Sequence, residues 1–226
     1  YPDFLLYIPA LLRVMGVGIN LSYHIFVAVC ILLTVISSFY CARYITRSSA
    51  ASLTAMAVTV LYQYHIDDIY TRSAVGEFTA AIFVPFVIAG MYDLIYRDFK
   101  KPQILGIGAV GVILCHTITT GYCVILCAFA LVFYVWRYVR KVRLIPKPDP
   151  ASTPEVILDS GGVTRLYDEN AGVVRDVTPA NNRVEESWVN VFVRLIFTLL
   201  LVMAVTAFYW MPMLEQLLTV SFRIQE

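Results

Sequence analysis

Four long runs of apolar residues constrain this chain more than any other feature. They cover residues 21–45, 75–96, 121–138 and 189–211, and each is close to the about 20 residues that a helix needs to cross a bilayer. Hydrophobic residues make up 59% of the 226 positions, and charged residues only 15%. A soluble fold cannot hide that much apolar surface, because its own surface needs polar cover. The sequence therefore predicts an all-α polytopic membrane protein.

Two shorter apolar runs, 50–64 and 102–115, decide how many crossings the chain makes. Cationic residues stay on the cytoplasmic side of a membrane, and here they follow the first, third and fifth of the six runs. They are Arg43, Arg47, Arg97, Lys100, Lys101, Arg137, Arg140, Lys141, Arg143 and Lys147. This alternation predicts six transmembrane helices, or five if one short run is re-entrant. Short spans need cover for their backbone, so we expect a cavity at the outer face.

The remaining segments are expected to lie outside the membrane. Residues 1–20 carry apolar side chains at helical spacing and are predicted to form an amphipathic interfacial helix on the outer surface. Residues 142–188 are rich in proline, glycine and asparagine, which predicts a polar cytoplasmic loop. Within it, 156–158 and 163–167 are expected to form a hairpin. The predicted order is the interfacial helix 1–20, transmembrane helices in 21–141, the loop 142–188, and a last transmembrane helix with an outer tail in 189–226.

Composition gives no support to several classes of protein. The five cysteines lie in or beside apolar runs, without the paired spacing of a zinc site or a disulfide framework. The sequence contains neither the Ser–His–Asp spacing of a hydrolase nor the His-Glu-x-x-His motif of a zinc enzyme. A net charge of +1 gives no reason to expect a nucleic-acid partner.

The densest polar cluster lies on the predicted outer side, at residues 64–72, and Glu77 follows it. The adjacent carboxylates of Asp67 and Asp68 can bind a divalent cation such as Mg²⁺ or Mn²⁺ through oxygen. Arg72 can hold a phosphate group. The alternative is a polar interfacial loop in which aspartate and arginine pair. Glu77 has a simpler alternative role, because an acidic residue in the first turn of a helix is stabilised by the helix dipole.

Two further groups are predicted to face the same compartment as this cluster. His116 lies between two apolar runs, and Glu215 follows the last run. A histidine in such a place is also often just hydrogen-bonded to a neighbouring carbonyl group. The candidate catalytic residues are Asp67, Asp68 and Glu77, with Asp67 and Asp68 as metal ligands. The candidate substrate-binding residues are His65, Tyr70, Arg72, His116 and Glu215.

Four short motifs, in their order and spacing, resemble a known family. They are Tyr1-Pro-Asp-Phe-Leu-Leu-Tyr7, Tyr70-Thr-Arg72 with Gly76-Glu77, Leu114-Cys-His116-Thr, and Phe208-Tyr-Trp210-Met-Pro212-Met-Leu-Glu215. Together they resemble bacterial integral membrane proteins labelled pyruvoyl-tetrahydropterin synthase-related, which are similar to members of the GT-C glycosyltransferase superfamily. The resemblance covers nearly all of the chain except 142–188.

This resemblance implies a multi-pass enzyme of the bacterial inner (plasma) membrane. It would transfer a sugar from a polyprenyl-phosphate donor on the extracytoplasmic side. In that superfamily an acidic residue of the first outer loop acts as base or metal ligand, and that loop would lie upstream of Tyr1. We therefore expect at least one preceding transmembrane segment, and the chain itself to be a glycosyltransferase or a segment of one. Asp67 and Asp68 would fall in the second outer loop.

Two other functions are compatible with the same sequence features. A lipid or solute transporter also uses broken helices and acids within the membrane, but the central portions of these runs carry no charged residue. A non-catalytic membrane subunit would use the outer polar cluster to bind a partner. An acidic residue soon after a preceding helix would favour the transferase over both.

Overall fold

The structure, a computed structural model, describes residues 4–144, 156–158, 164–168, 173–176 and 188–219. The chain forms two compact units. The first comprises residues 1–134 and 191–226, and the second comprises residues 135–190.

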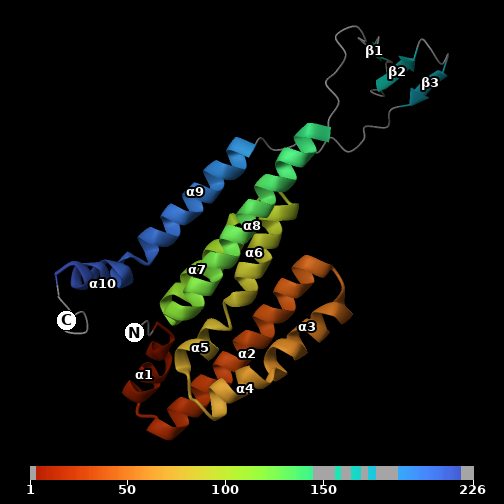
Figure 1. Cartoon of the computed structure of the whole chain (residues 1–226). Coiled ribbons are helices and arrows are strands. Elements are labelled where there is room, and N and C mark those ends of the chain that lie inside the picture. The colour runs from red at the N-terminus through yellow and green to blue at the C-terminus, as the bar shows by residue number, and fades with distance from the viewer. Residues whose placement is uncertain (1–3, 145–155, 159–163, 169–172, 177–187, 220–226) are drawn as a thin grey trace. The chain divides into compact units, whose positions relative to one another are not determined.

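The first unit consists of helices, which follow the predicted apolar runs (Figure 1). In chain order the helical elements are η1 (Phe4–Leu6), α1 (Tyr7–Val14), α2 (Ile19–Thr46), α3 (Ser49–Leu61), α4 (Gln63–Tyr70), α5 (Val75–Ala80), α6 (Val84–Tyr96), α7 (Pro102–Cys115), α8 (Thr117–Leu144, which continues into the second unit), α9 (Trp188–Val205) and α10 (Ala207–Thr219). The predicted helix over 1–20 is present as η1 and α1, and residues 1–3 lie outside the described residues.

Among the described residues, three segments are long and apolar enough to cross a membrane: α2, Val75–Tyr96 and Thr117–Arg140. The helices α9 and α10 add a fourth if the pair, bent by 61°, counts as one span. This is fewer than the five to six transmembrane helices predicted. The difference lies in α3 and α7, which have only 13 and 14 residues. Helices of that length are about 20 Å long, whereas the hydrocarbon core is about 30 Å thick.

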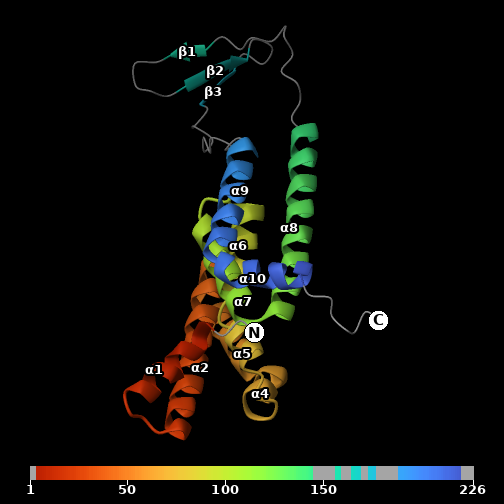
Figure 2. The same cartoon turned by 90° about the vertical axis from the view of Figure 1, so that its left-hand side faces the viewer.

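Helix α2 lies alongside α5 and α6 and runs in the same direction (Figure 2). The start of α2 therefore lies beside α5, and its end lies beside α6. Near the start of α2, the ring centroid of Phe26 lies 5.9 Å from that of Phe78 on α5. Near its end, the hydroxyl of Tyr44 donates to the carboxylate of Asp93 on α6. The cationic residues Arg47, Arg97 and Lys101 flank helix ends at the Tyr44 end.

Helices α6 and α7 pack closely because glycines remove side chains from their contact. A β-carbon at Gly90 would lie 2.6 Å from the β-carbon of Leu105, and one at Gly108 would lie 2.6 Å from the backbone nitrogen of Val87. Small residues are typical of helix contacts in membranes, where they let backbones approach. Because α7 packs closely on α6, the position of its C-terminal end is set, and His116 follows that end.

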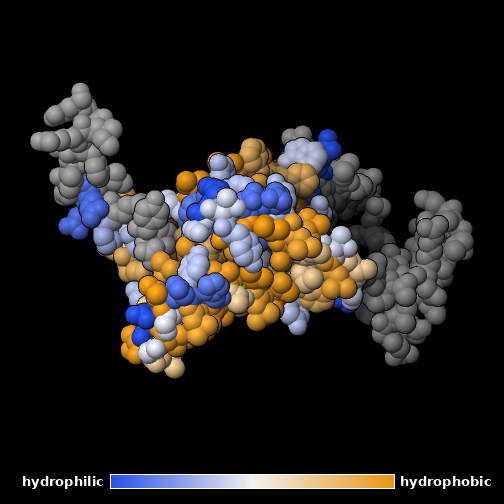
Figure 3. Space-filling view, turned by 90° about the horizontal axis from the view of Figure 1, so that it is seen from below, coloured by the Kyte–Doolittle hydropathy of each residue, from blue (hydrophilic) through white to orange (hydrophobic). Residues whose placement is uncertain are grey.

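The end of the unit that carries α1 and α4 has polar side chains on an otherwise apolar surface. Viewed from this end, hydrophilic residues gather on the visible face among hydrophobic ones (Figure 3). Behind them lies a buried cluster made of Phe26, Cys30, Ile69, Phe78 and Ile82.

The second unit contains a small antiparallel sheet with the order β1-β2-β3. Its strands are β1 (Val156–Leu158), β2 (Thr164–Asp168) and β3 (Val173–Asp176). Val156 pairs with Leu166, so the predicted hairpin is confirmed, with its second strand one residue later than expected. The third strand was not predicted. The rest of the predicted loop 145–187, and residues 220–226 of the predicted tail, lie outside the described residues.

Candidate functional site

The chain reverses between α4 and α5 in a tight turn. The backbone N–H of Arg72 donates to the carbonyl of Asp67 at 2.8 Å, and that of Ala74 donates to the carbonyl of Asp68 at 2.8 Å. Ser73 takes a left-handed conformation with φ of 49°. This turn brings the first turn of α5, with Glu77, back over the end of α4.

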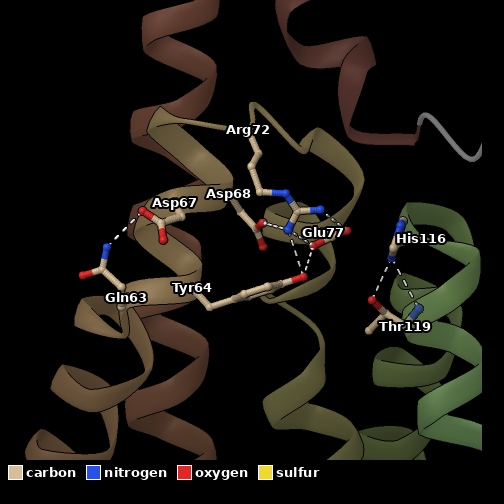
Figure 4. Close-up of polar contacts among 8 residues, drawn as sticks. All are labelled: Gln63, Tyr64, Asp67, Asp68, Arg72, Glu77, His116 and Thr119. Carbon is tan, nitrogen blue, oxygen red and sulfur yellow. Dashed lines mark hydrogen bonds and ion pairs between the residues drawn. The ribbon is translucent and has the colours of Figure 1, made fainter.

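Arg72 joins two carboxylates at this turn (Figure 4). Its Nη1 donates to Asp68 Oδ1 at 2.7 Å and to Glu77 Oε2 at 3.2 Å, and its Nη2 donates to Glu77 Oε1 at 3.3 Å. The hydroxyl of Tyr64 donates to Glu77 Oε2 at 2.5 Å and accepts from Arg72 at 3.0 Å. Four side chains from α4, the turn and α5 are therefore held in one network, which we call the Arg72 network.

The two carboxylates of this network have different surroundings. The side chain of Asp68 is only 3% exposed, whereas that of Arg72 is 48% exposed. Burial, followed by the negative charge of Glu77, raises the pKa of Asp68 to about 6, although Arg72 opposes the shift. The bond to Glu77 also raises the pKa of the Tyr64 hydroxyl, which keeps it protonated and able to donate.

A cavity of about 290 Å³ opens beside Glu77. One wall is apolar and consists of the η1 residues Phe4, Leu5 and Leu6. The remaining lining comes from the turn into α5 and from the end of α7, and consists of Ser73, Ala74, Val75, Gly76, Glu77, Thr79, Cys115 and His116. The cavity lies at the end opposite the cationic residues Arg47, Arg97 and Lys101.

His116 reaches this cavity as the residue that caps α8. Its Nδ1 accepts the backbone N–H of Thr119 at 3.3 Å and lies 2.8 Å from the hydroxyl of Thr119 (Figure 4). A side chain that accepts from the third helical N–H is a typical N-cap. Because Nδ1 accepts this N–H, the neutral ring carries its proton on Nε2 and can donate from that nitrogen.

The structure brings together some of the predicted site residues and separates others. Asp68, Arg72 and Glu77 form the Arg72 network, and Glu77 shares its cavity with His116. Asp67 lies outside the network and accepts from Gln63 Nε2 at 3.0 Å. The Arg72 network and the His116 turn thus lie at the same end of the unit.

The other three predicted residues take no part in the cavity lining. His65 is 7% exposed, its Nε2 has no hydrogen-bond partner among the described residues, and burial lowers its pKa. Tyr70 is exposed at the end of α4. Glu215 lies on α10, whose Tyr209 hydroxyl is 3.0 Å from the hydroxyl of Thr117 at the start of α8. Helix α10 therefore begins near the same end.

Asp67 and Asp68 do not fit a shared divalent cation in this arrangement. Successive residues of a helix point about 100° apart, and here the two side chains bond to different partners, Gln63 and Arg72. Within the described segments, no group of three or more histidine, cysteine, aspartate or glutamate side chains is placed to hold a metal ion.

Asp93 is an important acidic residue that the sequence analysis did not single out. It is fully buried on α6, where it accepts from the Tyr44 hydroxyl and, at 2.7 Å, from the backbone N–H of Lys101. The guanidinium of Arg97 lies 4.3 Å from the centroid of the Tyr44 ring. An aspartate inside an apolar run was the available signal, since such a charge needs partners. These contacts join α2, α6 and the start of α7 at the cationic end.

Comparison with known proteins gives this chain no relative. No family model, no curated protein and no solved structure matches it. The family resemblance of the short motifs stays a prediction.

Proposed function

We propose that this protein is a membrane glycosyltransferase, which takes a sugar from a polyprenyl-phosphate donor on the extracytoplasmic side of a bacterial inner membrane. One observation carries the proposal: a cavity at the end of apolar helices combines an apolar wall with the carboxylate of Glu77 and the imidazole of His116. A lipid-linked sugar presents the same combination of apolar and hydroxyl-rich surfaces. The motif resemblance points to the same reaction.

The distribution of charge supports placing the reaction on the extracytoplasmic side. Arg47, Arg97 and Lys101 flank helix ends at the end of α2, whereas the cavity lies near its start. Cationic residues favour the cytoplasmic side, so this orientation places Glu77 and His116 at the opposite face. A donor lipid in the outer leaflet would reach the cavity from the membrane.

The proposed reaction uses Glu77 as the general base. Its carboxylate takes the proton of the acceptor hydroxyl, whose oxygen forms a bond to the anomeric carbon of the sugar. The bond from that carbon to the lipid phosphate breaks, and the electron pair stays on the phosphate oxygen. Arg72, which is half exposed beside Glu77, offsets the charge that builds on this phosphate.

Tyr64 and Asp68 position these two groups in the proposal. The hydroxyl of Tyr64 holds Glu77 by a 2.5 Å hydrogen bond. Asp68 holds the guanidinium of Arg72 from its buried side at 2.7 Å. The predicted cation has no step in this mechanism, because Asp67 and Asp68 do not converge.

A transfer assay with the intact protein in membrane vesicles tests the proposal. Polyprenyl-phosphate sugars with different radiolabelled neutral hexoses are offered one at a time, and label leaving the lipid fraction is counted. We expect Glu77→Gln to lower kcat by about 10² or more, the usual contribution of a general base. Asp98→Asn, which changes an acid at the cationic end, is the matched control and keeps wild-type transfer. Full transfer by Glu77→Gln would exclude this mechanism.

One observation favours a transporter as the second candidate. The segment Val75–Tyr96 is interrupted between α5 and α6, and α9 meets α10 at 61°. Broken helices are common at transporter sites. The same vesicles distinguish the two functions, because a transporter moves the labelled lipid between leaflets and leaves its sugar attached, and a non-catalytic subunit does neither.

A further inference from the structure

The charges around the cavity disfavour an anionic ligand. The Arg72 network contains two carboxylates, Asp68 and Glu77, and one guanidinium. The cavity lining adds no lysine or arginine to this set, and Glu77 is its acidic member. A phosphate or carboxylate inside the cavity would therefore face a net negative charge when both acids are ionised.

The hydrogen-bonding groups of the cavity suit hydroxyl groups instead. Glu77 Oε2 accepts from both Tyr64 and Arg72, whereas Oε1 accepts from Arg72 Nη2. A carboxylate oxygen can accept two hydrogen bonds, so Oε1 retains one position. His116 offers the opposite function, because its Nδ1 is used by Thr119 and its Nε2–H is a donor. An acceptor and a donor thus border one cavity.

The apolar wall completes this pattern. Phe4, Leu5 and Leu6 line the side supplied by η1, and Phe4 is half exposed. A sugar ring has an apolar C–H face, which can lie on an aromatic ring, and a rim of hydroxyl groups. The volume of about 290 Å³ is at the small end for ligand pockets, which fits a single sugar unit better than a lipid chain.

We propose that this cavity holds the neutral sugar unit of the donor, and that the lipid phosphate stays outside it, on the exposed side of Arg72. His116 Nε2–H donates to an oxygen of this sugar, and the remaining position on Glu77 Oε1 is kept for the acceptor hydroxyl that reacts at the sugar. The assignment rests on the proposed transferase function. It makes Glu77 and His116 specificity residues that select a neutral sugar over a charged one.

Histidine NMR on the intact protein in nanodiscs tests this assignment directly. This chain has three histidines, His24, His65 and His116, so ¹⁵N labelling of histidine gives few signals from it, and His24→Gln and His65→Gln identify them. The probes are hexyl glycosides of glucose, galactose, mannose and N-acetylglucosamine, together with hexyl glucuronide and hexyl phosphate. We expect at least one neutral glycoside to shift the Nε2 signal of His116.

The charged probes and a variant give the specificity. Hexyl glucuronide and hexyl phosphate should bind roughly tenfold more weakly than the best neutral glycoside, because of like-charge repulsion. Glu77→Gln removes the negative charge beside the cavity, so it should narrow the difference in affinity between the neutral and the charged probes. Tighter binding of hexyl phosphate, or no His116 shift with any neutral glycoside, would overturn the assignment. Neither result bears on sugar transfer, which the vesicle assay with Glu77→Gln decides separately.

Discussion

The imidazole of His116 lies directly against the α-carbon of Gly76. A β-carbon at position 76 would come 2.9 Å from Cδ2 of that ring and 2.9 Å from the carbonyl oxygen of Cys115. This contact joins the first turn of α5 to the end of α7. Both segments contribute to the cavity lining, so the cavity depends on the absence of a side chain at this position.

Replacing Gly76 with alanine should therefore disrupt the cavity. One of the two close atoms belongs to the backbone, so a side-chain rotation cannot relieve the overlap. We expect a loss of about 1–3 kcal/mol in unfolding free energy, measured by thermal unfolding in detergent, together with weaker binding of hexyl glycosides. Gly121→Ala is the control, because a β-carbon there meets nothing within 4 Å. Equal stability of the two variants would contradict the close approach.

Hydropathy alone predicted most of the helices. The run 102–115 coincides with α7, and 21–45 lies within α2. The free energy of transferring a segment from water to lipid depends on the residues of that segment alone, so such helices can be predicted from the sequence. The number of crossings could not be read in the same way, because α3 and α7 are apolar but too short. Whether such helices cross depends on what covers their ends.

The site was only partly predictable for a related reason. Asp67 and Asp68 look alike in sequence, but Asp68 is four residues before Arg72, the spacing at which helical side chains meet. That signal could have separated them. The partnership of Tyr44 with Asp93, 49 residues apart, depends on how α2 packs along α6. No local pattern encodes such a contact.

The Asp68 carboxyl should titrate near pH 6 rather than near 3.8, its ordinary value. Infrared spectroscopy of protein with ¹³C-labelled aspartate can follow this group. Glu77→Gln should lower the pKa of Asp68, since the charge of Glu77 raises it. Arg72→Gln should raise that pKa further, since the guanidinium lowers it. Shifts in the opposite directions would show that the charges of Glu77 and Arg72 do not set the pKa of Asp68.

The same shift predicts how stability depends on pH. Between about pH 4 and 6 the folded protein keeps the Asp68 proton while the unfolded chain loses it. The contribution of Asp68 to the unfolding free energy therefore falls as pH rises through this window and levels off above it. The Asp68→Asn variant should lack this component in thermal unfolding at a series of pH values. An identical profile in wild type and variant would refute the prediction.

Tyr44→Phe should destabilise the cationic end of the helices. Asp93 is fully buried and accepts hydrogen bonds from the Tyr44 hydroxyl and from Lys101 N–H. Losing one donor to a buried carboxylate costs about 1.5–3 kcal/mol. The control, Tyr40→Phe, changes a 66% exposed tyrosine on the same helix and should stay within about 0.5 kcal/mol of wild type. Chemical unfolding in micelles measures both, and equal values would show that Asp93 does not need Tyr44.

Two glycines of α7 should respond differently to alanine, although they lie in the same helix. A β-carbon at Gly111 would lie 2.1 Å from ring atoms of Phe83, in the break between α5 and α6, whereas one at Gly106 would meet only the Thr198 methyl at 3.6 Å. Phe83 packs against buried apolar side chains and cannot move far. We expect Gly111→Ala to cost about 1–3 kcal/mol, and Gly106→Ala to be neutral or to gain up to about 1 kcal/mol from helix propensity. Thermal unfolding of both variants measures the difference in unfolding free energy. If Gly106→Ala lost as much stability as Gly111→Ala, the contact with Phe83 would not explain which glycine tolerates alanine.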